Sequence, residues 1–275
     1  MIVFRFFDQN NLKKRQKTVH YFLYLSVVYS GCFFMYQMDS ELSFTKCGAD
    51  GKLKIHEAVA MMMDCCQFQE YQEAGLCAYL RENQIAVFLS SIQIDILRMP
   101  EFREKVNTAV KIYGCKSIYG LRRITMRDNA GNLCLISNAT GAFFDLNAKK
   151  ALKVDPEVFN VKFDEAEEME CLPRKIPVPA GVSGKTVPAF VVRSSDLDPN
   201  GHLTSPVYFA IAANALEPDF AYNRVRIEYK QQAKNGNFVL PVVYYDNNKV
   251  VVDMKSGSGI SYAVAEFSTI PSITE

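Results

Sequence analysis

The chain has 275 residues, of which 49% are hydrophobic and 22% are charged. Its 31 basic and 30 acidic side chains leave a net charge of +1, which describes a globular protein of one or two domains. A nucleic-acid-binding surface needs a clustered basic excess, so we expect no nucleic acid among the partners.

The first 37 residues differ in composition from the rest. A basic cluster that ends at Lys17 precedes residues 19–38, a run without lysine, arginine or carboxylate. Its length approaches the ~20 apolar residues of a membrane helix, although its serine, glycine, glutamine and tyrosine weaken that interpretation. Because Met35 and Met38 precede the first globular pattern, we favour residues 1–37 as an extension read from an upstream start codon. A membrane anchor is the alternative.

Residues 38–153 show a pattern of one helix followed by strands. The segment GKLKIHEAVAMMMDCCQF carries apolar side chains at helical spacing, and its methionines are typical of a packed core. Runs rich in β-branched and aromatic residues then predict four strands, at residues 85–98, 105–113, 119–127 and 132–145.

Residues 154–188 have the prolines and the acidic run of a linker, and residues 189–275 repeat the first pattern. The segment GHLTSPVYFAIAANALEP predicts a second apolar helix. Strands are expected after it, at residues 222–233, 238–245, 249–255 and 260–269. The fold class is therefore α+β. In each unit the sheet can curl around its helix, and two such units can pair their sheets about a pseudo-twofold axis.

Asp198, Asn200 and His202 stand at alternate positions just before the second helix. A carboxylate, a carboxamide and an imidazole in one polar turn can orient a water, polarise a carbonyl and transfer a proton. Asp198 can also act as a helix cap or turn former, and both roles are compatible. Lys52 stands in the first unit where the second has His202, so we expect one site, in the second unit.

The run DLDPNGH at residues 196–202 resembles the Asp-Leu-Asp-x-Asn-x-His motif of the fatty acyl-acyl carrier protein (ACP) thioesterases of plants and bacteria. Residues 118–146 are similar to paired strands of that family, with Arg122 and Arg123 at their start. The resemblance covers residues 39–270. It implies a tandem hot-dog fold, in which each unit is a helix wrapped by a curved antiparallel sheet.

The resemblance also implies a function, the hydrolysis of acyl-ACP thioesters to free fatty acid and carrier protein in the cytoplasm. Asp198, Asn200 and His202 would be catalytic, no cofactor or metal would be needed, and backbone N–H groups from residues 203–205 would hold the oxyanion. The plant enzymes have Glu-Cys where this chain has Gln232 and Ala233. Gln232 would be an auxiliary residue that hydrogen-bonds water but accepts no proton.

Several alternatives remain open. One alternative function is that of a thioesterase for coenzyme A esters. Another is that of a non-catalytic acyl-binding protein. The methionines of the first helix would either pack as core or line a compartment for the acyl chain. A homodimer stays an alternative to a monomer. An acidic carrier protein would be attracted by exposed cations, with these candidates: Arg98, Arg103, Lys105, Arg122, Arg123, Lys149, Lys150 and Lys153.

Cysteine and histidine content excludes two further classes. The eight cysteines contain no CxxC pair, and Cys65 and Cys66 are adjacent, which favours reduced thiols over a disulfide framework. With three histidines in the whole chain, a histidine-rich zinc site is not expected.

Overall fold

The computed structural model describes residues 2–4, 35–72, 79–155, 163, 165–246 and 248–270. Most of the N-terminal extension, including residues 19–34 of the apolar run, lies outside these ranges. Among the residues described, no helix combines the length and the hydropathy needed to cross a membrane.

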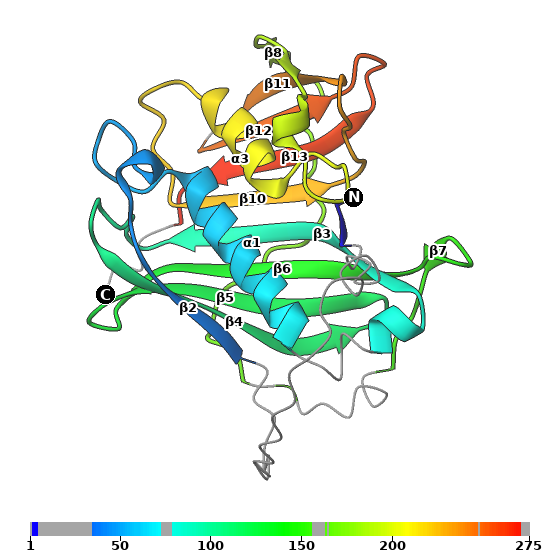
Figure 1. The fold of residues 1–275 in the computed structure, drawn as a ribbon. Helices are drawn as coiled ribbons and strands as arrows, with labels where there is room; N and C mark the ends of the chain where they lie inside the picture. Colours follow the sequence, from blue (N-terminus) through cyan, green and yellow to red (C-terminus); the bar gives the residue numbers. More distant parts are fainter. Residues whose placement is uncertain are drawn as a thin grey trace, which may run out of the picture.

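Strands make up most of both halves of the chain (Figure 1). Those before the linker are β1 (Ile2–Phe4), β2 (Met35–Glu41), β3 (Ile85–Ile96), β4 (Lys105–Lys116), β5 (Tyr119–Asp128), β6 (Leu133–Asp145) and β7 (Lys150–Ala151). The remaining strands are β8 (Lys185–Thr186), β9 (Phe190–Val191), β10 (Arg224–Tyr229), β11 (Phe238–Asp246), β12 (Lys249–Lys255) and β13 (Ser261–Ser268).

These strands form one antiparallel sheet that runs through both halves. Its order is β2-β4-β5-β6-β3-β10-β13-β12-β11-β8, and β1, β7 and β9 pair with it off this path. The halves meet where β3 pairs with β10, in a register that places Ile92 opposite Ile227. The expected pairing of the two sheets side by side is therefore present.

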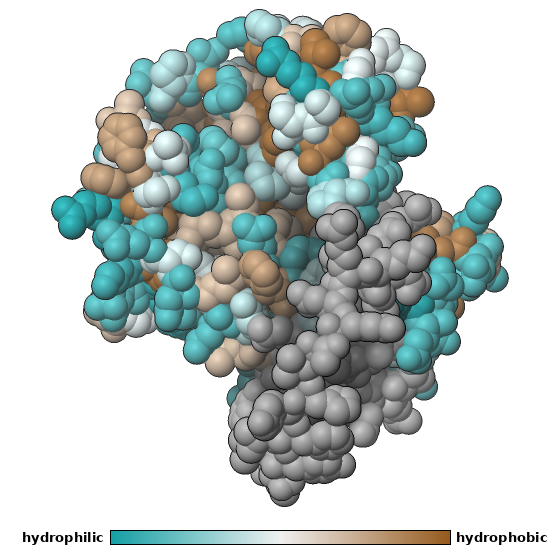
Figure 2. Space-filling view, in the orientation of Figure 1, coloured by the Kyte–Doolittle hydropathy of each residue, from teal (hydrophilic) through white to brown (hydrophobic). Residues whose placement is uncertain are grey.

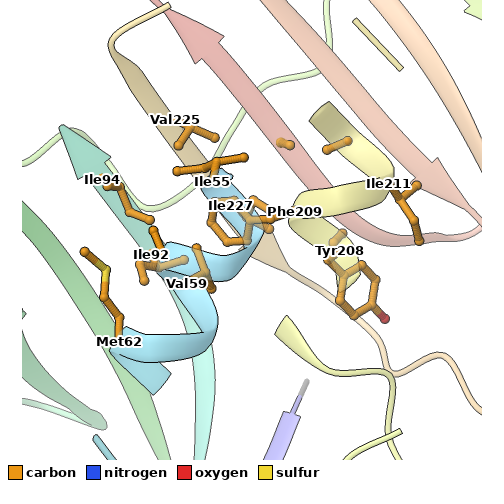
Figure 3. Packing of buried hydrophobic residues seen from close by; sticks show 14 of the residues in the cluster. Ile55, Val59, Met62, Ile92, Ile94, Tyr208, Phe209, Ile211, Val225 and Ile227 are labelled. Atoms are coloured by element: carbon orange, nitrogen blue, oxygen red, sulfur yellow. The ribbon is translucent and has the colours of Figure 1, made fainter. Parts of the chain in front are cut away.

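The helices α1 (Ile55–Gln72) and α3 (Ser205–Asn214) contact each other on one face of this sheet (Figure 1). Along α1 the fully buried positions include Ala58, Met62 and Cys65, a spacing of three to four residues that forms one apolar stripe. Figure 3 shows Met62 and Val59 of α1 packed beside Ile92 of β3. The methionine stripe thus lies in the core.

One hydrophobic cluster spans both halves. It includes Ile92 and Ile94 from β3, Val225 and Ile227 from β10, and Phe209 from α3, as Figure 3 shows. On the space-filling surface, hydrophilic side chains predominate and hydrophobic ones are scattered between them (Figure 2). The largest hydrophobic cluster is therefore shared by the two units beneath both helices, and two smaller clusters lie apart from it.

The described part of the linker crosses the face of the sheet opposite the helices. Because Ile92 and Ile94 face the helices, Gln93 between them faces the other way. Its side chain donates to the carbonyl of Glu170 at 2.8 Å and accepts the N–H of Leu172 at 3.0 Å. The linker is thereby attached at the junction of the two halves.

Asp95 and Arg224 form a buried ion pair at the same junction. Arg224 Nε and Nη2 donate to the two carboxylate oxygens of Asp95 at 2.7 and 2.6 Å, and the two side chains are 6% and 9% exposed. Arg224 Nη1 also donates to Glu170 of the linker at 2.7 Å. Strand β3, strand β10 and the linker are thus joined by one guanidinium group.

Candidate active site

A tight turn before α3 holds the predicted site residues. Asp198 Oδ1 accepts the backbone N–H of Asn200 at 2.8 Å and that of His202 at 3.0 Å. The Asp198 N–H donates to the carbonyl of His202 at 2.8 Å, and Gly201 takes the left-handed conformation with φ = 76°. Glycine adopts this conformation without steric cost, so the Asp198 side chain and Gly201 together define the turn.

The turn brings the side chains of Asp198 and His202 together. His202 Nδ1 lies 3.9 Å from Asp198 Oδ1, within the range of an ion pair, and the side chains are 12% and 14% exposed. Asn200, between them in sequence, is half-buried. A carboxylate and an imidazole are therefore adjacent and largely shielded from water, as an acid–base pair requires.

Residues 230–233, which follow β10, run beside the turn. The Leu203 N–H donates to the carbonyl of Ala233 at 3.0 Å. His202 comes directly before Leu203 in the chain, and Gln232 comes directly before Ala233. The N–H groups of Lys230 and Gln231 both donate to the carbonyl of Tyr262 in β13, at 2.8 and 3.0 Å. The predicted auxiliary residue Gln232 is thus held next to the turn by bonds on both sides.

Two tyrosines that the sequence did not single out fix α3 against this segment. The Ala233 N–H donates to the hydroxyl of Tyr208 at 3.1 Å, and the Ser205 hydroxyl hydrogen-bonds the hydroxyl of Tyr229. Burial raises the pKa of both tyrosines far above its ordinary value, so both stay neutral. A buried tyrosine in an apolar helix needs a hydrogen-bond partner for its hydroxyl group. The presence of Tyr208 in such a helix is therefore the sequence signal that would have indicated its role.

The expected oxyanion donors are mostly occupied. The Leu203 N–H is bonded to Ala233, and the Thr204 N–H donates to the carbonyl of Asp196 at 3.1 Å. Of residues 203–205, Ser205 alone has an N–H without such a bond within the described part of the chain. The expectation that this whole stretch holds an oxyanion is therefore wrong for Leu203 and Thr204.

The first unit repeats the backbone of the turn without its chemistry. Gly51 has φ = 76°, like Gly201, and the Gly48 N–H donates to the carbonyl of Lys52 at 2.8 Å. The Leu53 N–H donates to the carbonyl of Pro100 at 2.8 Å, so Met99 occupies the place of Gln232. Gly48, Lys52 and Met99 thus replace Asp198, His202 and Gln232, which agrees with the expectation of one site.

Among the described residues, one group has the geometry to hold a metal ion: Glu104, Asp128 and Cys134. The guanidinium of Arg98 already lies among these ligand atoms, with Nη2 at 2.6 Å from Glu104 and 3.2 Å from Cys134 Sγ. Because Arg98 neutralises the carboxylates, this cluster is an ion-pair network of the first unit.

Several candidate cations for carrier docking are engaged elsewhere. Arg98 binds Glu104, and Arg122 Nη2 lies 2.6 Å from the buried carboxylate of Glu70. Arg123 is 4% exposed and contacts the Met169 sulfur and the face of Tyr113. These three arginines stabilise the first unit and leave little charge for a partner.

Comparison with known proteins agrees with this geometry. Residues 34–161 match the family model described as the acyl-ACP thioesterase N-terminal domain. An acyl-ACP thioesterase from Bacteroides thetaiotaomicron superposes with a TM-score of 0.77 at 18% identity, over 86% of this chain and 97% of the other. A 12:0-ACP thioesterase from Umbellularia californica gives 0.69 at 12% identity, over 87% and 98%. No curated protein sequence matches the chain.

The fold is therefore the predicted α+β tandem hot-dog, with one helix and one half of the sheet in each unit. Residues 34–161 match the acyl-ACP thioesterase family, and this match identifies a thioester hydrolase whose fold the solved thioesterases share along most of the chain. The resemblance inferred from the sequence is confirmed.

Proposed function

We propose that this protein hydrolyses fatty acyl-ACP thioesters to free fatty acid and carrier protein at the turn containing Asp198, Asn200 and His202. The observation that carries the proposal is the adjacency of the His202 imidazole and the Asp198 carboxylate, 3.9 Å apart and largely buried, in a chain whose residues 34–161 match this family. We place the reaction in the cytoplasm, in keeping with the six free cysteines among the described residues.

In the proposed reaction, His202 accepts a proton from a water molecule whose oxygen attacks the thioester carbonyl carbon. The carbonyl π electrons move to oxygen and form a tetrahedral oxyanion. When the C=O bond re-forms, the C–S bond breaks, and the phosphopantetheine thiolate leaves with the proton that His202 returns. Asn200 orients the water or the carbonyl through its amide group.

Asp198 fits the role of an orienting residue better than that of a nucleophile. Its Oδ1 already holds two backbone N–H groups and faces Nδ1 of His202. A carboxylate 3.9 Å from Nδ1 stabilises the protonated imidazole through its charge, and we assign the proton exchange with water to Nε2. The proposed division is therefore His202 as base and acid, with Asp198 positioning it.

The test is release of free thiol from acyl-ACP and acyl-coenzyme A substrates of several chain lengths, with the full chain. We expect turnover that favours the carrier-bound substrates. His202→Ala should lower kcat by about 100-fold or more, because general acid–base catalysis contributes that much. Lys52→Ala, at the matching position of the first unit, should leave kcat unchanged.

The other outcomes separate the alternatives. Equal or better turnover of coenzyme A esters would identify a coenzyme A thioesterase of the same fold. Tight binding of acyl-ACP without thiol release would identify an acyl-binding protein and contradict the proposed reaction.

A further inference from the structure

The side-chain amide of Gln232 stands out among the polar groups beside the turn. Its Nε2 atom is buried, and within the described residues it has no hydrogen-bond partner. A buried amide donor without a partner is unfavourable in a folded protein, and at a site it indicates a group that binds a ligand atom. This observation adds to the proposed function and rests on it.

The reaction has a need that this donor would meet. The tetrahedral oxyanion must be stabilised by N–H or O–H donors that point at it before the reaction begins. The N–H groups of Leu203 and Thr204, the natural backbone donors, are bonded to Ala233 and Asp196. The site therefore lacks most of the backbone oxyanion hole that a helix start usually offers, and another donor is required.

The position of Gln232 is fixed by its neighbours. Before Gln232 in the chain, the N–H groups of Lys230 and Gln231 are bonded to Tyr262. After it, Ala233 is bonded to Leu203 and Tyr208. The side chain therefore projects from a segment held at both ends, and little reorganisation is needed when charge develops in front of it.

The first unit supplies a natural comparison. The backbone bond from Leu53 to Pro100 repeats the bond from Leu203 to Ala233, and it puts the thioether Met99 where the second unit has Gln232. Met99 packs against the hydrophobic core. The unit that lacks the histidine thus also lacks the amide, as expected if both belong to the same site.

We propose that the Gln232 side-chain N–H donates a hydrogen bond to the thioester carbonyl oxygen as that oxygen becomes the oxyanion. Gln232 keeps its proton throughout, and no bond to it is formed or broken. Its contribution is electrostatic, so it appears in kcat rather than in the binding of the ground-state substrate.

The first experiment compares Gln232→Met, Gln232→Glu and the matched control Gln231→Met on the carrier-bound substrate. Gln231 is the exposed neighbour in the same segment. We expect Gln232→Met to lower kcat by about 100- to 1000-fold with KM nearly unchanged, the loss typical of one oxyanion donor. Gln231→Met should match the wild type.

Gln232→Glu separates donation from the positioning of water. A carboxylate repels the oxyanion, so the ratio of variant to wild-type kcat should be lowest at neutral pH. It should rise as the pH falls and the carboxyl group gains a proton that it can donate. If Gln232 instead holds the attacking water through its oxygen, Gln232→Glu will be as active as the wild type at neutral pH, and donation to the oxyanion is refuted.

A binding measurement tests the same donor without turnover. The hydrated form of a pantetheine-linked trifluoromethyl ketone resembles the tetrahedral intermediate, whereas an S-alkyl pantetheine thioether has no oxygen at the corresponding carbon. By calorimetry, Gln232→Met should weaken ketone binding about tenfold or more, as loss of an oxyanion donor implies, and leave binding of the S-alkyl thioether unaffected. If the wild type binds the ketone in this selective way but releases no thiol, the proposed function fails, although Gln232 is shown to donate to a tetrahedral oxygen. Equal ketone binding by both proteins, or none by the wild type, overturns that role.

Discussion

Asp198 has two tasks that different substitutions can separate. Its Oδ1 organises the turn by accepting two N–H groups, and its charge faces the imidazole of His202. Because the two tasks use the same atom, a single alanine variant confounds stability with catalysis. An amide at this position would keep the acceptor and remove the charge.

We predict that Asp198→Ala lowers both stability and kcat, whereas Asp198→Asn lowers mainly kcat. Alanine leaves the N–H groups of Asn200 and His202 without their acceptor, at about 1–3 kcal/mol for each N–H that stays buried. Urea unfolding and thiol release measure the two effects. An asparagine variant as unstable as the alanine variant would show that the charge, and not the acceptor, holds the turn.

At the residue scale, the sequence predicted what lies within a few positions of one turn. Asp198 and His202 are four residues apart, so one turn suffices to bring them together. The bonds of Ala233 to Leu203 and Tyr208 join residues 25 or more positions apart, and no local pattern encodes them. The catalytic roles of Asp198, Asn200, His202 and Gln232 stay predictions.

At the scale of elements, the expected strands agree closely with the observed ones where polar turns separate them. The predicted strand at residues 222–233 is the main exception, since β10 ends at Tyr229. Residues 230–233 contain no β-branched or aromatic side chain, and the N–H groups of Lys230, Gln231 and Ala233 bond Tyr262 and Tyr208 outside the ladder with β13. The strands β1, β7, β8 and β9 were missed because segments of two or three residues carry no periodicity. The seven-residue strand β2 was also missed, because its first three residues were assigned to the N-terminal extension.

The segment after β10 gives a prediction about carrier selectivity. Lys230 and Lys234 are exposed and flank Gln232. The double variant Lys230→Glu/Lys234→Glu should lower kcat/KM for acyl-ACP about tenfold at low salt, because it reverses the attraction between these cations and an acidic carrier. The loss should shrink as salt is added.

The control is the pair Lys149→Glu/Lys150→Glu, at and beside strand β7. These residues belong to the sequence-based set of docking candidates, so the two double variants compare two positions for the carrier. A loss of kcat/KM confined to the Lys149→Glu/Lys150→Glu protein would place docking at β7 and contradict the prediction for β10.

At the scale of the whole molecule, we expect the two units to unfold together. They share a sheet through β3 and β10 and a core through α1 and α3. The sequence predicted the duplication, because the two helix segments and their strands repeat in the same order. It did not predict the junction register, which depends on Asp95 and Arg224, residues 129 positions apart. The unit boundaries at residues 153 and 189 stay predictions.

Arg224→Leu should destabilise the protein by about 3–5 kcal/mol, because it leaves the buried carboxylate of Asp95 without its partner. The double variant Asp95→Leu/Arg224→Leu should recover most of that loss, since two apolar side chains replace the pair. Urea unfolding followed by two probes, one in each unit, should give coincident transitions. Separate transitions would show that the halves unfold independently.

The pairing of β3 with β10 also bears on motion. A protein of two units joined by a linker alone can open and close about a hinge, but here backbone hydrogen bonds and a buried ion pair cross the boundary. Rotation of one unit against the other would break them. In the proposed reaction, entry of the acyl chain and exit of the product would therefore depend on movements of loops and side chains around a rigid sheet, and not on the opening of two domains.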